Sequence, residues 1–191
     1  MSGIRIEYFG LAWMVIETLG SLGVGILSGN FALIAFGSDS LIELLSGYVV
    51  LNHLKEELSN SEVDGKNAEL LTTILLFSLV PIIGIGAVYS YLIGLRPETT
   101  PIGIAIAVGA VIITPYLLYQ KKRIGKEARC FPLSIDAIAT RTCFLMSLAL
   151  LGGLLAEFFF GFWWAAYLAT GIILILITKE AIESYKETKE A

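Results

Sequence analysis

The sequence predicts an all-α fold, a multi-pass membrane protein with six transmembrane helices. Of its 191 residues, 56% are hydrophobic and 16% are charged, whereas soluble domains carry about 25% charged residues. Six apolar segments are each long enough to cross a hydrocarbon core of about 30 Å, which takes about 20 helical residues. They lie near residues 9–29, 31–52, 70–95, 101–120, 130–156 and 158–178. No segment of soluble-domain length remains, so we expect residues 1–191 to form a single transmembrane domain.

The first two segments are predicted to form a helical hairpin. Segment 9–29 is too long for the apolar part of a signal peptide and contains Glu17, so we expect it to remain in the protein as a helix. Gly29 and Asn30 both accept left-handed backbone angles and predict the tight turn that follows. Two roles are open for Glu17: it extends a polar path through the membrane, or it makes a hydrogen bond in helix packing.

Ionisable residues are concentrated in three of the six segments. The third, fourth and sixth segments contain no Asp, Glu, Lys or Arg. The first carries Glu17, and the remaining two carry Asp39, Glu43, Asp136 and Arg141. This distribution predicts that three helices surround something polar. Because an unpaired guanidinium at membrane depth is costly, Arg141 should face a carboxylate or an aqueous path.

The connections between the segments predict the orientation of the chain. We expect a polar loop over 55–69, a basic loop over 121–129 and a last turn around Glu157. If both termini lie on one side, that side holds 11 of the 13 Lys and Arg residues: Arg5, Lys55, Lys66, Lys121, Lys122, Arg123, Lys126, Arg129, Lys179, Lys186 and Lys189. Cytoplasmic loops are enriched in Lys and Arg. Both termini should therefore be cytoplasmic, with the chain in the cell membrane.

The two acids in segment 31–52 are the strongest candidates for a functional site. In a helix, Asp39 and Glu43 lie one turn apart on the same face. Near the centre of a bilayer each acid costs roughly 2.5–3.5 kcal/mol unless it faces a partner, an ion or water. The structural alternative is a pair of protonated or hydrogen-bonded acids that holds helices together.

The fifth segment offers further metal ligands. By residue count from the helix ends, Cys143 lies at a depth comparable to that of Asp39 and Glu43. Asp136 lies two turns away on roughly the same face, about 10 Å closer to the cytoplasm. Two carboxylates and a thiolate form a three-ligand site for a divalent cation: Mn²⁺, Fe²⁺ and Zn²⁺ suit the carboxylates, and Zn²⁺ or Cd²⁺ suits the thiolate. The alternative for Cys143 is a small apolar core residue.

The chain resembles the transmembrane domain of the cation diffusion facilitator family, six-helix exporters of zinc and related divalent metals. The stretch Asp39-Ser40-Leu41-Ile42-Glu43 is similar to the family's second helix, where an acid or His is followed four residues later by an Asp. Residues 136–143 resemble the family's Ala-Asp-Ala-Leu-His-Thr-Arg-Thr-Asp in the fifth helix. Here Ala139 stands in place of the His, and Cys143 in place of the Asp. The family's soluble C-terminal metal-binding domain is not expected, so the chain looks like a short, tail-less branch.

The resemblance implies a transporter and not an enzyme. It implies a homodimer in the lipid bilayer that exports a divalent metal ion (Zn, Mn, Fe or Cd) in exchange for protons, with no cofactor besides this substrate. Asp39, Glu43 and Cys143 would be the ligands, and Asp136 a secondary ligand or proton acceptor. The alternative is a non-transporting membrane scaffold or accessory protein that inherited the fold. No nucleophile–base pair or metalloprotease motif indicates an enzyme, and no basic domain indicates nucleic-acid binding.

Overall fold

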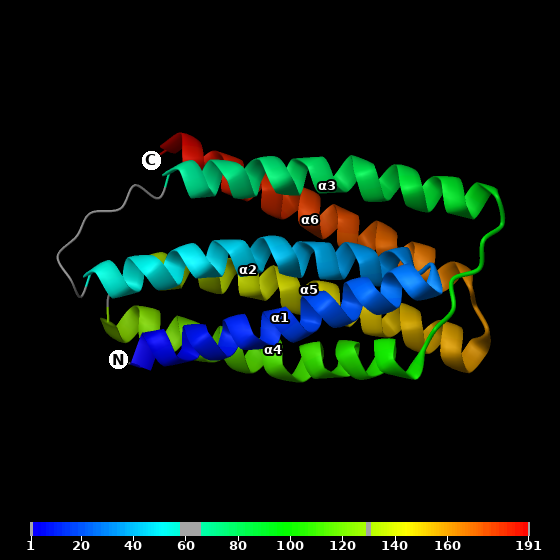
Figure 1. The fold of residues 1–191 in the computed structure, drawn as a ribbon, viewed down its shortest axis with the longest axis horizontal. Helices are drawn as coiled ribbons and strands as arrows, with labels where there is room; N and C mark the ends of the chain where they lie inside the picture. The colour runs from blue at the N-terminus through cyan, green and yellow to red at the C-terminus, as the bar shows by residue number, and fades with distance from the viewer. Residues whose placement is uncertain (1, 58–65, 129–130, 191) are drawn as a thin grey trace.

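In the computed structural model, which describes residues 2–57, 66–128 and 131–190, the described chain forms six α-helices and no strand (Figure 1). The helices are α1 Ser2–Ser28, α2 Phe31–Glu57, α3 Lys66–Leu92, α4 Pro101–Ala128, α5 Phe131–Phe160 and α6 Trp164–Glu190. Near several helix ends, including residues 131–138, the description covers the backbone alone. The prediction of an all-α fold is confirmed.

Within the described residues, five helices are long and apolar enough to cross a membrane. They are α1, α3, α4, α5 and α6, and their apolar spans are between 19 and 24 residues long. A hydrocarbon core of about 30 Å takes about 20 helical residues, so these helices fit a multi-pass membrane protein. The helix that carries Asp39 and Glu43, α2, is not among the five.

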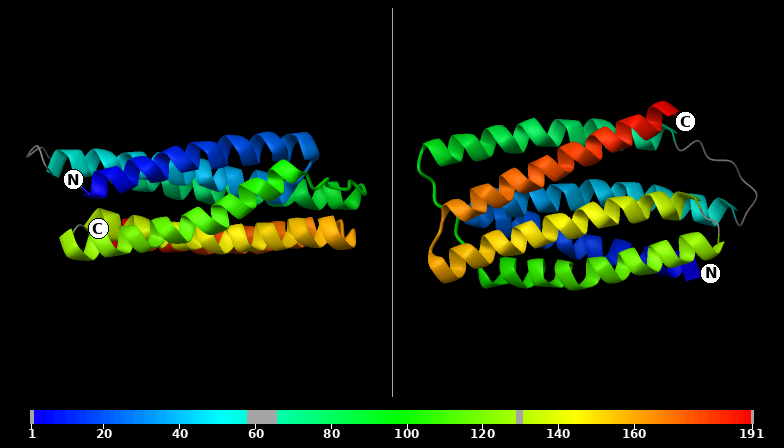
Figure 2. Two further views of the ribbon diagram at one scale, coloured as in Figure 1. Left: turned by 90° about the horizontal axis from the view of Figure 1, so that it is seen from below. Right: turned by 180° about the vertical axis from the view of Figure 1, so that it is seen from behind.

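The helices pack in two layers of three (Figure 2). In one layer α2 contacts α1 and α3, and in the other α5 contacts α4 and α6. Because α2 also contacts α5 and α6 across the layers, α2 and α5 occupy the centre of the bundle. The core there includes the fully buried side chains of Phe36, Met146 and Leu150. The start of α1 and the end of α6 lie at the same end of the bundle (Figure 1).

The predicted turn between the first two helices is confirmed. Gly29 ends α1 with a φ of +63°, a conformation that glycine adopts without steric cost. The side-chain oxygen of Asn30 then accepts hydrogen bonds from the backbone N–H groups of Ala32 (3.1 Å) and Leu33 (3.3 Å). An N-cap of this kind satisfies amide groups that have no partner within the helix. The α1–α2 hairpin is therefore fixed at its turn by local interactions.

Most helices extend beyond the predicted apolar segments; α1 begins at Ser2 and α6 ends at Glu190, for example. Instead of turning at Glu157, α5 continues to Phe160, and Gly161 follows with a φ of +68°. Similarly, α4 extends to Ala128, so most of the expected basic loop over 121–129 is helical. The reason is that Lys, Arg and Glu are good helix formers. Their appearance in the sequence marks the edge of the apolar span and not the end of the helix.

A buried ion pair joins α1 to α4 near the end of the bundle where α1 begins. Lys121, expected in a loop, is 0% exposed, and its Nζ lies 3.6 Å from Oε2 of Glu7, which is 1% exposed. Removing one partner of such a pair leaves an uncompensated buried charge, which is strongly destabilising. This contact therefore ties the two layers together away from the candidate functional site.

Candidate functional site

Three of the four predicted ligands lie in the interior of the bundle. Asp39 and Glu43 on α2 are 3% and 5% exposed, and Cys143 on α5 is 4% exposed. The two helices contact each other directly. Asp39 and Glu43 share a face of α2 because they are one helical turn apart. The fold thus brings acids from one central helix toward a thiol from the other.

The acids are close enough to influence one another. Asp39 interacts electrostatically with Glu43 and with Glu17, and Cys143 interacts with all three carboxyl groups. In a low-dielectric interior, neighbouring groups of like charge cannot all ionise unless a cation compensates them. The chemistry of this cluster is therefore that of a site that holds protons or a cation.

Glu17 on α1 contacts side chains of both α2 and α5. Its Oε1 accepts a hydrogen bond from the Ser40 hydroxyl on α2 at 2.6 Å, and the Cys143 thiol on α5 lies 3.6 Å from the same oxygen. Its Oε2 accepts a hydrogen bond from Trp13 Nε1 at 2.5 Å. Glu17 is 1% exposed. One carboxyl group therefore contacts donors from α1, α2 and α5.

The sequence left two roles open for Glu17, and its position decides between them only in part. Glu17 does make packing hydrogen bonds, but its partners belong to the same cluster as Asp39 and Glu43. The signal in the sequence was an acid within an otherwise apolar segment. The sequence did not show that Ser40 and Cys143 would be its neighbours, because that depends on how three helices pack.

Two other predicted site residues are not brought into the cluster by the described structure. Asp136 belongs to α5, but its side chain lies outside the described residues. Arg141 is exposed on α5 and so does not lie among the buried carboxyl groups, which leaves the aqueous path as the other surrounding predicted for it.

The cluster is not a preformed metal centre. Among the side chains that the structure describes, no three His, Cys, Asp or Glu residues stand together in an arrangement that could hold a metal ion. The oxygen of Glu17 and the sulfur of Cys143 are adjacent, but a further ligand has to approach them from α2. Any metal binding at this site therefore requires a shift of side chains or helices.

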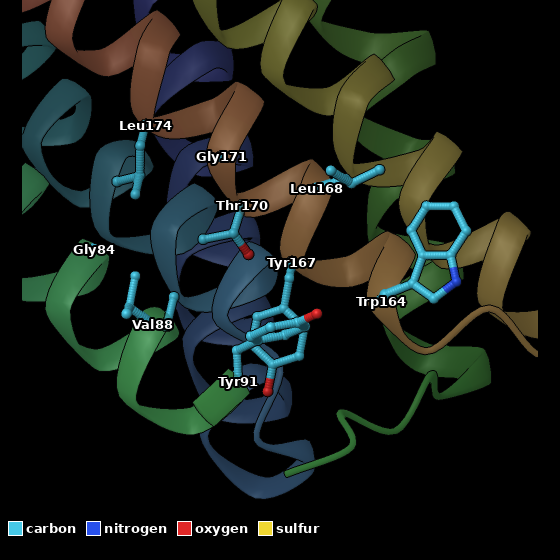
Figure 3. Close-up of a pocket in the computed structure, with 10 residues that line it drawn as sticks. Gly84, Val88, Tyr91, Trp164, Tyr167, Leu168, Thr170, Gly171 and Leu174 are labelled. Carbon is cyan, nitrogen blue, oxygen red and sulfur yellow. The ribbon is translucent and has the colours of Figure 1, made fainter. Parts of the chain in front are cut away.

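A separate groove of about 450 Å³ lies between α3 and α6 (Figure 3). Gly84 and Val88 of α3 and Leu168 and Leu174 of α6 are among the residues that line it. Two tyrosines, one from each helix, pack edge to face against each other in its wall. Its lining contains no carboxyl group and no thiol. The groove is thus chemically distinct from the cluster of acids between α1, α2 and α5.

Comparison with protein-family models and with curated proteins gives no match to this chain.

Proposed function

We propose that this chain is a six-helix transporter of divalent metal ions and belongs to the cation diffusion facilitator superfamily. The observation that carries the proposal is the buried cluster of Asp39, Glu43 and Cys143, with Glu17 beside them. Buried acids are expensive in a membrane and are retained for ion paths and binding sites. Carboxylate and thiolate groups are the ligand types that bind Zn²⁺, Mn²⁺, Fe²⁺ or Cd²⁺.

In this proposal α2 is the sixth transmembrane helix. It contacts α1, α3, α5 and α6, so its acids face protein where a peripheral helix would face lipid. A central helix can therefore be less apolar than the helices around it. The start of α1 and the end of α6 lie at the same end of the bundle (Figure 1). This supports a topology in the cell membrane with both termini cytoplasmic.

The transport cycle that we propose is export of the metal ion in exchange for protons. A metal ion displaces protons from carboxyl and thiol ligands when it binds, which supports such coupling. Because the described side chains do not form a three-ligand arrangement, the ion has to be loaded by a conformational change, as alternating access requires. Asp136 serves as a secondary ligand or proton acceptor, and the transporter is a homodimer, both by the family resemblance.

The second candidate is a membrane scaffold or accessory protein that has the fold without transport activity. The observation that favours it is the same lack of a three-ligand arrangement among the described side chains. Ala139, at the position of the family's histidine, offers no ligand. The buried acids argue against this candidate, because a scaffold gains nothing from their desolvation cost.

Metal flux into liposomes that contain the purified protein separates the two candidates. We expect flux of at least one of Zn²⁺, Mn²⁺, Fe²⁺ and Cd²⁺ by the unaltered chain. Asp39→Asn and Glu43→Gln keep the shape of the side chains but remove the negative charge, so each should abolish flux. Neither should unfold the bundle, because removing a buried charge also removes its desolvation penalty.

The matched control is Glu98→Gln, which removes a carboxylate that is exposed on the connection between α3 and α4. It should carry metal at the rate of the unaltered protein. Flat traces for every ion with a folded protein would favour the scaffold. Normal flux in both α2 variants would show that Asp39 and Glu43 only hold helices together.

A further inference from the structure

The groove between α3 and α6 is open toward the outside of the bundle. Val88 on α3 and Leu168 on α6 line it and are 60% and 58% exposed, so the rest of the described bundle does not cover them. Both helices are long and apolar enough to cross a membrane. In a bilayer the open side of the groove therefore faces lipid.

A glycine leaves the groove empty without serving helix packing. Gly171 lines the groove, and nothing lies within 4 Å of a Cβ atom added to it. Glycines in membrane helices commonly let two backbones approach closely. Gly37 has that role, since a Cβ atom added there would lie 2.8 Å from the backbone nitrogen of Leu22. Gly171 instead leaves space in a groove of about 450 Å³, a volume typical of small-molecule sites.

The groove is elongated along the two helices and apolar inside. Its lining runs from Gly84 to Tyr91 on α3 and from Trp164 to Leu174 on α6, which corresponds to about 10–15 Å at 1.5 Å per helical residue. Thr170 also lines it, but its hydroxyl donates a hydrogen bond to the carbonyl oxygen of Ala166 on the same helix (2.8 Å). This shape and lining suit a hydrocarbon chain.

An aromatic cluster and an arginine lie at one end of the groove. Figure 3 shows Tyr91 and Tyr167 together at this end, and the Tyr167 hydroxyl donates a hydrogen bond to the carbonyl oxygen of Leu95 (2.8 Å). The Trp163 ring stacks on Tyr91, with centroids 5.7 Å apart, and the Arg96 guanidinium carbon lies 5.8 Å from the Trp163 centroid. Trp and Tyr favour the membrane–water interface, and a cation–π contact holds the guanidinium there. A positive charge thus lies at the polar end of an apolar groove.

This charge is not neutralised by a carboxylate of the described chain. Of the acids at this end of the bundle, Glu98 is exposed and Glu157 accepts a hydrogen bond from the Thr99 hydroxyl (2.6 Å). Among the described residues, neither acid forms an ion pair with Arg96. The planar N–H donors of a guanidinium match the oxygens of a phosphate group.

We propose that this groove is a binding site for one phospholipid of the surrounding bilayer, with an acyl chain between α3 and α6 and the phosphate on Arg96. A second copy of the chain fits less well. In a two-fold pair that closed the groove, the opposite surface would be the same groove, whose lining offers no carboxylate to Arg96. A phospholipid supplies both the apolar chain and the anion. The site lies apart from the cluster of acids and does not depend on the proposed metal transport.

The test is native mass spectrometry of the purified, delipidated full-length protein in detergent. It is titrated with phosphatidylglycerol and, separately, with a diacylglycerol of the same chains, which lacks the phosphate. We expect one phosphatidylglycerol per chain and about fivefold weaker binding of diacylglycerol, the effect of one basic residue on an anionic lipid. Arg96→Gln should weaken binding of phosphatidylglycerol about fivefold and leave that of diacylglycerol unchanged. Gly171→Leu should abolish binding of both, because the new side chain fills the groove.

Two matched controls should bind phosphatidylglycerol like the unaltered protein. Lys122→Gln removes an exposed basic residue of α4, and Gly23→Leu adds an apolar side chain at an exposed position of α1 where nothing lies within 4 Å of an added Cβ atom. Circular dichroism checks that each variant is folded, and Arg96→Gln tests the site even if Gly171→Leu does not fold.

Unchanged phosphatidylglycerol binding in Arg96→Gln or in folded Gly171→Leu overturns the proposal, as does equal affinity of the unaltered protein for the two lipids. Absence of bound phosphatidylglycerol on the unaltered protein overturns it as well. The same spectra report the oligomeric state. A change from dimer to monomer in Gly171→Leu without loss of bound lipid would show that a second copy of the chain, and not a phospholipid, occupies the groove.

Discussion

At the scale of single residues, Cys143 shows how burial and neighbours point to different roles. Its 4% exposure alone fits a small apolar core residue. However, its sulfur lies 3.6 Å from a Glu17 oxygen and interacts with Glu43 and Asp39. An apolar residue of similar size would fill the same space without placing a thiol against three carboxyl groups. The surroundings of Cys143 therefore favour a ligand.

This interpretation predicts an ion-specific effect of Cys143→Ala. The variant should weaken binding of Cd²⁺ strongly and binding of Mn²⁺ little, because only a thiophilic ion gains much from a thiolate ligand. Competitive binding of the two ions to the purified protein measures the difference. Cys130→Ala, which removes the cysteine thirteen residues earlier in the sequence, is the matched control and should leave the ratio unchanged. An unaltered ion preference in Cys143→Ala would show that Cys143 is an apolar core residue and not a ligand.

The sequence predicted the acids of this site better than it predicted their contacts. Asp39 and Glu43 were identifiable because acids are rare in apolar helices and costly there. Glu17 carried the same signal, but its direction depends on the packing of α1 against α2 and α5. For Arg141 the sequence left two surroundings open, because its face on α5 depends on how that helix packs.

At the scale of helices, small residues let α1 and α2 pack closely beside the cluster. A Cβ atom added to Gly37 would lie 2.8 Å from the backbone nitrogen of Leu22 and 2.9 Å from Cβ of Ser21. One added to Gly25 would lie 2.9 Å from the backbone nitrogen of Ile34. Close backbone contacts of this kind are typical of helix interfaces in membranes. They hold Glu17 at hydrogen-bonding distance from Ser40.

We therefore expect Gly37→Ala to destabilise the protein by about 1–3 kcal/mol, the usual cost of overpacking. The neighbouring backbone atom cannot move aside as the end of a flexible side chain could. Gly23→Ala is the control, because nothing lies within 4 Å of a Cβ atom added there. Unfolding of both variants in mixed detergent gives the comparison. Equal stability of the two variants would contradict close packing between α1 and α2.

Helix ends were harder to predict than helix bodies. The apolar segments located all six helices, and Gly29 and Asn30 located one turn. At the end of α5, however, the apolar sequence continues through Phe158–Phe160, and hydropathy alone does not separate it from α6. The residue that does so is Gly161, with its positive φ. Local backbone conformation, and not composition, sets that boundary.

At the scale of the whole molecule, the two-layer packing explains why the ionisable residues of three helices meet. In the contacts between helices, α2 touches both α1 and α5, and these three helices carry Glu17, Asp39, Glu43 and Cys143. By contrast, α3 and α6 pair along one edge of the bundle and enclose an apolar groove (Figure 3). The cluster of Glu17, Asp39, Glu43 and Cys143 therefore lies apart from the apolar groove, an arrangement that suits an ion path through the membrane.

The same architecture predicts the topology of the chain. The described helices alternate in direction, so the connections α1–α2, α3–α4 and α5–α6 lie at one end of the bundle, opposite the start of α1 (Figure 1). A reporter fused after Ala191, and another inserted near Asp64 in the α2–α3 connection outside the described residues, should both report the cytoplasm. A reporter at Glu98, between α3 and α4, should report the external side.

The physical reason is the unequal distribution of basic residues. Of the 13 Lys and Arg residues in the chain, Arg96 lies on the α3–α4 connection near Glu98, whereas the sequence predicts eleven on the side of the termini. Basic residues near helix ends are retained in the cytoplasm during insertion. A reporter with opposite readouts in the two compartments, fused at each position in turn, measures the topology directly. If Glu98 proved to be cytoplasmic like Asp64, α3, which lies between these two positions, would not cross the membrane, and the six-helix topology would be wrong.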